Sequence, residues 1–294
     1  MTELARDEFL DVNLLLEQSL PRAPGRWLGY GALAFLALLL LGAFGAGSSS
    51  APPLLQSIYI LGMIALMGSF GVMSWINARA AQQEQRQMQS AEELIQLRRW
   101  DQAALLLRQI LSQPARSMQS HVQMLLYLAA VLARYHRYAD TATVYDHLLE
   151  MDYQDEQSVH ALRAGRAMSL LHDERLYDAD RAINELRRDS SAANSAPLAL
   201  IEIYRDVKTG HPQDAIDLFR QKLPLIRKQL GHRAADAYAL AARAYDLLGQ
   251  QAEAQSAYES ATLLAPEAEL HRRYSEVAAL AGKYPAAQAP AEVA

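Results

Sequence analysis

One stretch of the sequence restricts the possible folds more than any other, because no Asp, Glu, Lys or Arg occurs from Trp27 to Ala78. Charged residues make up 21% of the chain, so a gap of this length is far from a chance event. The stretch divides into two apolar runs, 27–46 and 54–76. Each is about 20 residues long, the length of an α-helix that crosses the hydrocarbon of a bilayer. Small polar residues and the pair Pro52-Pro53 lie between them, so the pattern predicts a transmembrane helical hairpin.

Two other interpretations of the apolar runs fit the sequence less well. A buried hairpin in a soluble core would also be apolar, but soluble helices rarely run this far without a charge. A cleavable signal peptide begins with a short basic segment. Here 26 residues with five carboxylates precede the first run, and a second apolar run follows it. We therefore expect the first run to be retained.

The basic residues beside the apolar runs predict the orientation of the hairpin. Arg22 and Arg26 precede the first run, Arg79 and Arg86 follow the second, and the connecting loop has no basic residue. Because Lys and Arg concentrate on the cytoplasmic side, we expect a two-helix protein of the inner membrane with both termini in the cytoplasm. No ionisable group lies inside the hydrocarbon, so a proton or ion path is not expected.

The pattern of residues 1–21 predicts a separate helix, which is acidic and rich in leucine and ends at Pro21. It lacks the Lys/Arg face of a helix that lies on anionic lipid. We expect it to contact protein instead, either its own downstream domain or another chain.

A repeat follows residue 82. Five segments align without gaps, with starts 38, 38, 36 and 39 residues apart. They begin at Trp100, Tyr138, Leu176, Pro212 and Gln251. The position three residues on is small: Ala103, Thr141, Ala179, Ala215 and Ala254. Four further on it is large and apolar: Leu107, Tyr145, Ile183, Phe219 and Tyr258. An apolar-periodic helix precedes each segment, so we expect antiparallel helix hairpins in tandem, an all-α solenoid over 82–284. A plain helical bundle is the alternative.

The repeat resembles the tetratricopeptide repeat family, which pairs two helices per unit with small residues where they cross. The last unit matches best, with Tyr238, Ala242, Tyr245, Gly249, Ala254, Tyr258, Ala261 and Pro266 at the family's spacing. Lys222 stands where the family has a small residue, and the units are two to five residues longer than usual. The resemblance covers roughly residues 87–282.

The resemblance implies that the first helix of each pair lines a groove that holds a peptide or helix. Carried over position by position, it gives the candidate groove residues Leu126, Arg134, Met168, Tyr204, Lys208 and Arg243. The three cations of this set favour an acidic ligand, and the N-terminal segment 3–20 is one candidate. The family's two-carboxylate clamp is not reproduced. Beyond the repeats, we expect 271–284 to form a polar terminal helix and 285–294 to be disordered.

No catalytic pattern accompanies the repeats. The chain has no Cys, which excludes disulfides, Cys-ligated metal centres and a thiol nucleophile. No metalloprotease, serine-hydrolase or phosphate-loop motif occurs. The densest polar cluster, His172-Asp173-Glu174, falls at a predicted turn and is interpreted as a solvated loop. A net charge of −5 argues against nucleic-acid binding. We expect neither cofactor nor metal, although a site assembled from distant residues would escape this search.

Together these patterns predict a membrane-anchored scaffold or adaptor rather than an enzyme. Its partners would be proteins that bind the groove and the lipid bilayer around the hairpin, with homo-oligomers possible. The alternative is a structural subunit of a membrane transport or envelope-biogenesis complex, in which the hairpin packs on other membrane subunits.

Overall fold

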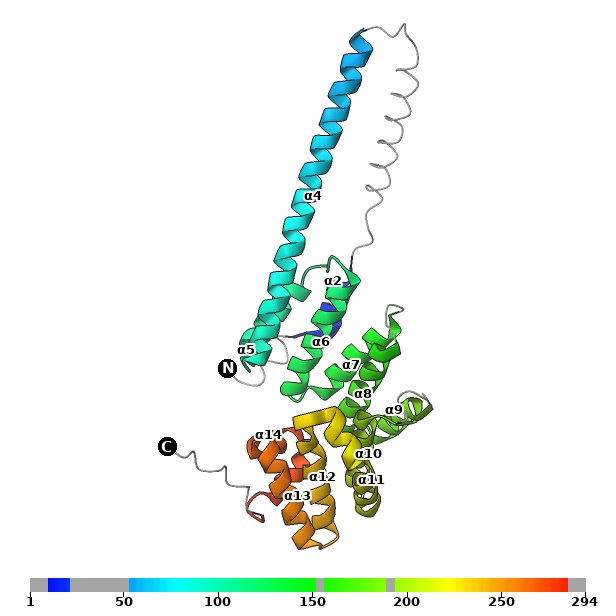
Figure 1. The fold of residues 1–294 in the computed structure, drawn as a ribbon, viewed down its shortest axis with the longest axis vertical. Coiled ribbons are helices and arrows are strands. Elements are labelled where there is room, and N and C mark those ends of the chain that lie inside the picture. The colour runs from blue at the N-terminus through cyan, green and yellow to red at the C-terminus, as the bar shows by residue number, and fades with distance from the viewer. Residues whose placement is uncertain (1–9, 22–52, 152–155, 189–193, 285–294) are drawn as a thin grey trace, which may run out of the picture. The chain divides into compact units, whose positions relative to one another are not determined.

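The computed structural model describes residues 10–21, 53–151, 156–188 and 194–284, and these residues form an all-α fold (Figure 1). Consecutive helices pack in antiparallel fashion. Two compact units divide the chain at Tyr135 and His136, and each is described by itself. The first contains α2 (Val12–Ser19), α4 (Pro53–Gln96), α5 (Trp100–Leu111) and α6 (Met118–Arg134). The second contains α7 (Tyr138–Glu150), α8 (Glu156–His172), α9 (Leu176–Arg188), α10 (Ala196–Lys208), α11 (Pro212–Leu230), the 3-10 helix η1 (Gly231–Arg233), α12 (Ala234–Leu247), α13 (Gln251–Leu264), α14 (Glu267–Arg273) and the 3-10 helix η2 (Ser275–Leu280).

The five aligned segments of the sequence begin where α5, α7, α9, α11 and α13 begin. Each is preceded by a turn of three residues whose middle residue has a positive φ, between 58° and 78°. These middle residues are Arg98, His136, Glu174, Gly210 and Gly249. In four of the turns the next amide donates back across the helix end, as from Gln250 to the carbonyl of Tyr245 at 3.0 Å. This is the hydrogen bond of a Schellman cap, so one turn geometry recurs throughout the repeat.

The positions predicted to lie at helix crossings are interior. The five small residues, from Ala103 to Ala254, are all buried with at most 1% exposure. The large residues four positions on are buried as well, except Tyr145, which is partly buried. Small side chains at these positions let adjacent helix backbones approach, and the large ones fill the space beside them.

In the first unit, α2 packs against α5. Asp11 caps α2 by accepting from the amide of Leu14 at 3.2 Å, and Leu15 and Leu16 are buried. Beyond the end of α2, the amide of Ala115 donates to the carbonyl of Ser19 at 3.1 Å. The described part of the predicted N-terminal helix therefore lies on a second helix of a hairpin. The sequence offers this segment as one candidate ligand of the groove, and its described part contacts α5 within the first unit. Residues 1–9 lie outside the described residues.

The second apolar run of the sequence belongs to α4, a single helix of 44 residues. Every residue from Met67 to Arg79 is exposed, including Met67, Phe70 and Trp75 at 60% or more. A search of the described residues for a helix with the length and apolar character needed to cross a membrane finds none. The first predicted span, 27–46, and the loop that follows it lie outside the described residues.

The predicted terminal helix over 271–284 is broken. α14 ends at Arg273, Tyr274 is extended with φ −130° and ψ 99°, and η2 follows. Val277 and Leu280 are fully buried and Tyr274 is 2% exposed. The segment is therefore part of the core rather than a polar cover, because the break at Tyr274 turns its apolar residues inward. Residues 285–294, predicted to be disordered, lie outside the described residues.

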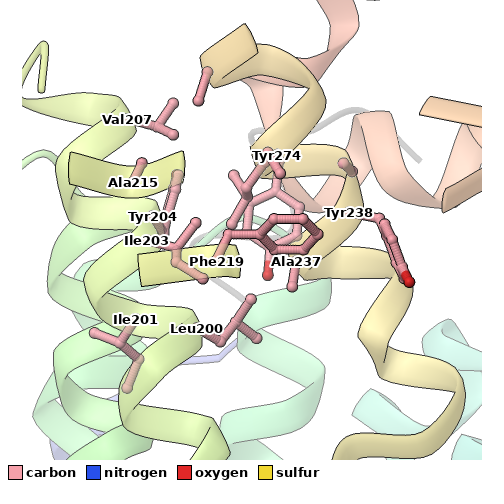
Figure 2. Close-up of a cluster of buried hydrophobic side chains, with 14 of the residues drawn as sticks. Leu200, Ile201, Ile203, Tyr204, Val207, Ala215, Phe219, Ala237, Tyr238 and Tyr274 are labelled. Carbon is pink, nitrogen blue, oxygen red and sulfur yellow. The ribbon is translucent and has the colours of Figure 1, made fainter. Parts of the chain in front are cut away.

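The core of the second unit joins α10, α11 and α12 to this C-terminal segment (Figure 2). Figure 2 shows Tyr204 of α10, Phe219 of α11 and Tyr274 meeting in one cluster. All residues of α12 from Ala234 to Ala242 are buried. Because this part of α12 is buried on every side, other elements must pack against each of its faces. The C-terminal segment packs against one of them.

Candidate functional site

The predicted groove residues fall in both units. Leu126 and Arg134 lie on α6 in the first unit, where both are partly buried and the Arg134 guanidinium lies 5.3 Å from the centre of the Trp100 ring. Met168 on α8, Tyr204 and Lys208 on α10, and Arg243 on α12 lie in the second unit. These last four stand on the first helices of successive hairpins, and α10 contacts both α8 and α12. We call the face formed by α8, α10 and α12 the inner face.

Residues 273–284, which we call the strap, lie along the inner face. The strap comprises the last residue of α14, the extended Tyr274, η2 and a final turn at Gly282, where φ is 75°. Its apolar side chains share one core cluster with α10 and α12. The inner face of the second unit is therefore filled by the chain's own C-terminal segment.

Four aromatic rings meet where the strap crosses α10. His172 stacks on Tyr138 with ring centres 4.5 Å apart and planes 16° apart. Tyr204 lies 4.9 Å from His172, and Tyr274 of the strap lies 5.0 Å from Tyr204 in an edge-to-face arrangement. Such pairs stabilise by about 0.5–1.5 kcal/mol beyond their area burial. Tyr274 is thus the residue by which the strap enters the inner face.

Burial sets the protonation of this aromatic cluster. It lowers the pKa of His172 to about 4, and the nearby Lys208 lowers it further while Glu276 opposes both. The imidazole is therefore neutral at pH 7, and its Nδ1 lies 3.1 Å from the hydroxyl of Tyr204. Burial and the Glu276 carboxylate raise the pKa of Tyr204 far above its usual range, so this hydroxyl keeps its proton.

The strap is held at three points along its length, each of which includes a charged side chain of α10 or α12. At its start, Arg273 reaches the fully buried Asp236 of α12 at 2.7 Å. In the middle, Glu276 lies 3.0 Å from Nζ of Lys208, which is itself only 10% exposed. At its end, the hydroxyl of Tyr284 donates to Asp246 of α12 at 2.9 Å.

Lys283 of the strap also pairs with Asp246. The same carboxylate accepts from Arg243 at 3.0 Å. These hydrogen bonds and cations hold the pKa of Asp246 below its usual range against the effect of burial. Two of the predicted groove cations, Lys208 and Arg243, therefore already face carboxylates of the chain itself.

Sequence reasoning missed the strap side of this site. The sequence predicts that Tyr274 and Glu276 belong to a polar terminal helix, whereas the structure places them at the centre of the contact with α10. It predicts that His172 lies in a solvated loop, whereas His172 ends α8 with its ring stacked in the aromatic cluster. The sequence signal for this cluster is a pair of aromatic residues at helix ends. Tyr138 begins the second helix of one hairpin, and His172 ends the first helix of the next hairpin.

The inner face of the second unit holds ion pairs and ring contacts between the chain's own elements. No group of three or more His, Cys, Asp or Glu side chains that could hold a metal ion occurs among the described residues. Comparison with family models, with curated proteins and with solved structures returns no match to this chain.

Proposed function

We propose that the chain is a membrane-anchored, tetratricopeptide-like interaction scaffold whose inner face binds segments of protein partners. The observation that carries the proposal is the strap. A largely irregular segment of the chain lies along α12 and α10, fixed by aromatic insertion and by charges at three points. A face that holds one short segment in this way has the apolar core and polar ends that peptide recognition requires.

The repeated hairpins support the solenoid part of the proposal. Five three-residue turns share a middle residue with positive φ, and the small residue at the crossing position is buried in each second helix. Stacking of such units leaves one set of helices along one face, which is the arrangement that repeat proteins use for binding.

The exposed part of α4 supports the membrane anchor. From Met67 to Arg79 the helix is exposed on all sides, and most of its side chains are apolar. Arg79 lies with its guanidinium 5.0 Å from the centre of the Trp75 ring. A tryptophan followed by an arginine is the residue pair expected where a helix leaves the hydrocarbon. We propose that 27–76 is a hairpin in a bacterial inner membrane and that both units are cytoplasmic.

Co-purification in mild detergent tests this function. Partners captured by the full chain should be lost when the chain is ended after Tyr135, because the second unit carries the strap-covered inner face. Ending the chain there leaves α2, α4, α5 and α6 in place. The alternative function, a structural subunit that packs through its hairpin, predicts that the partners stay bound to the shortened chain.

A further inference from the structure

The strap is one continuous segment that follows the last helix pair of the second unit. It follows α13 after the two-residue connection Ala265-Pro266 and the short α14. The helices behind it contact one another without it: α10 packs on α11, α11 on α12, and α12 on α13. Its ordered centre, η2, is a 3-10 helix of six residues, a form with poorer hydrogen-bond geometry than an α-helix.

The charges of the strap each pair with a charge of the inner face, and Lys283 does so while its side chain stays 45% exposed. Along the strap they run positive, negative, positive at Arg273, Glu276 and Lys283. The inner face carries the opposite charge at each of these points, with Asp236, Lys208 and Asp246. A segment whose only task was to keep the end of a repeat array soluble would place its charges outward. Matched charges on both partners instead fix the register and direction of a bound segment.

We propose that the strap is an internal ligand, which occupies the partner site until a partner segment of the same chemistry displaces it. This rests on the proposed binding function and names the ligand class. The segment would carry an aromatic residue, a carboxylate two positions later, and apolar residues at the third and sixth positions after the aromatic one. These are the positions of Tyr274, Glu276, Val277 and Leu280. A basic residue would follow at the ninth position, as Lys283 does. The mixed charge replaces the purely acidic ligand that the sequence predicts.

A labelled peptide of residues 273–284 tests displacement on the full chain in detergent. In the wild-type chain the strap competes from within, so binding should be weak. Glu276→Lys in the chain places two ammonium groups together at Lys208 and should release the strap, with peptide binding at least tenfold tighter. Glu253→Lys, the same charge change on an exposed residue of α13, is the matched control and should leave binding unchanged.

A charge exchange separates recognition of this site from general loosening. A chain with Lys208→Glu should bind a peptide that carries Glu276→Lys and should reject the wild-type peptide. A merely structural role for the strap would not produce this reversal of preference. Self-association of the wild-type chain that increases with protein concentration and is lost in the Glu276→Lys chain would mean that the strap of a second copy is the occupant, which overturns displacement by a different partner.

Hydrogen exchange on the wild-type chain tests whether the strap opens by itself, even where a variant fails to fold. Amides of 274–284 should exchange through an opening that leaves α12 and α13 protected. Exchange of the strap only together with those helices would overturn the proposal, as would a folded Glu276→Lys chain with an open strap that does not bind the peptide. Because the ligand is the chain's own segment, these outcomes do not depend on whether any cellular partner is captured.

Discussion

The amide of Ala115 donates to the carbonyl of Ser19 at 3.1 Å, which joins the end of α2 to the segment after α5. The next amide, of Arg116, donates to Glu84 of α4 at 3.3 Å. Ser19, which precedes the uncharged stretch, and Glu84, which follows it, therefore contact neighbouring residues of one connection in the first unit. From Glu84 to Pro53, α4 rises about 46 Å at 1.5 Å per residue. The proposed membrane hairpin would place these two flanks on the same side of the membrane.

The first prediction is the side on which each flank lies. The chain has no Cys, so a single introduced thiol is labelled without background. Ser49→Cys, in the predicted external loop, should react with a membrane-impermeant maleimide in intact cells. Ser90→Cys, at an exposed position of α4 on the C-terminal side of its apolar part, should react only after the cells are opened. Labelling of both positions, or of Ser90→Cys alone, in intact cells would contradict the proposed orientation.

The second prediction concerns Gly165 of α8. A Cβ at this position would lie 2.5 Å from Cζ of Tyr145 on α7. Alanine is favoured over glycine within a helix by about 1 kcal/mol, but overpacking costs about 1–3 kcal/mol. We therefore expect Gly165→Ala to lower the free energy of unfolding in urea. In a chain that also carries Tyr145→Leu the contact is absent, so the same change should become neutral or stabilising. An equal effect in both backgrounds would show that the Tyr145 ring does not restrict the site.

The repeated part of the fold could be predicted because its signal is local. Ala at one position and a large apolar residue four later mark a helix crossing wherever they recur. The start of each second helix followed from that register. The strap could not be predicted this way. Tyr274 and Glu276 lie in a stretch that reads as a polar helix, and their partners Lys208 and His172 are distant in sequence. Only the folded array brings these groups together.

The third prediction tests a helix crossing directly. Ala254 of α13 is fully buried, whereas Ala252, two residues earlier, is exposed. Ala254→Leu forces three extra carbon atoms into the contact with α12 and should lower the free energy of unfolding by about 1–3 kcal/mol. Ala252→Leu makes the same chemical change on the outer side and should alter it by less than about 0.5 kcal/mol. Equal melting of the two variants would mean that α12 and α13 cross elsewhere.

The last prediction is a dependence of stability on pH that originates at His172. Its pKa is about 4 in the folded protein because the ring is buried, against about 6.5 in an unfolded chain. The unfolded state therefore binds the proton first as the pH falls. The stabilisation by the neutral ring is complete above pH 6.5 and is lost progressively between pH 6.5 and 4. The shift corresponds to at most about 3 kcal/mol. Urea titrations of the second unit's unfolding at pH 7 and pH 5 should show this loss. His172→Phe keeps an aromatic ring against Tyr138 but removes the titrating group, so its stability should change less over the same interval. A variant that loses as much stability as the wild type between pH 7 and pH 5 would assign the dependence to other groups.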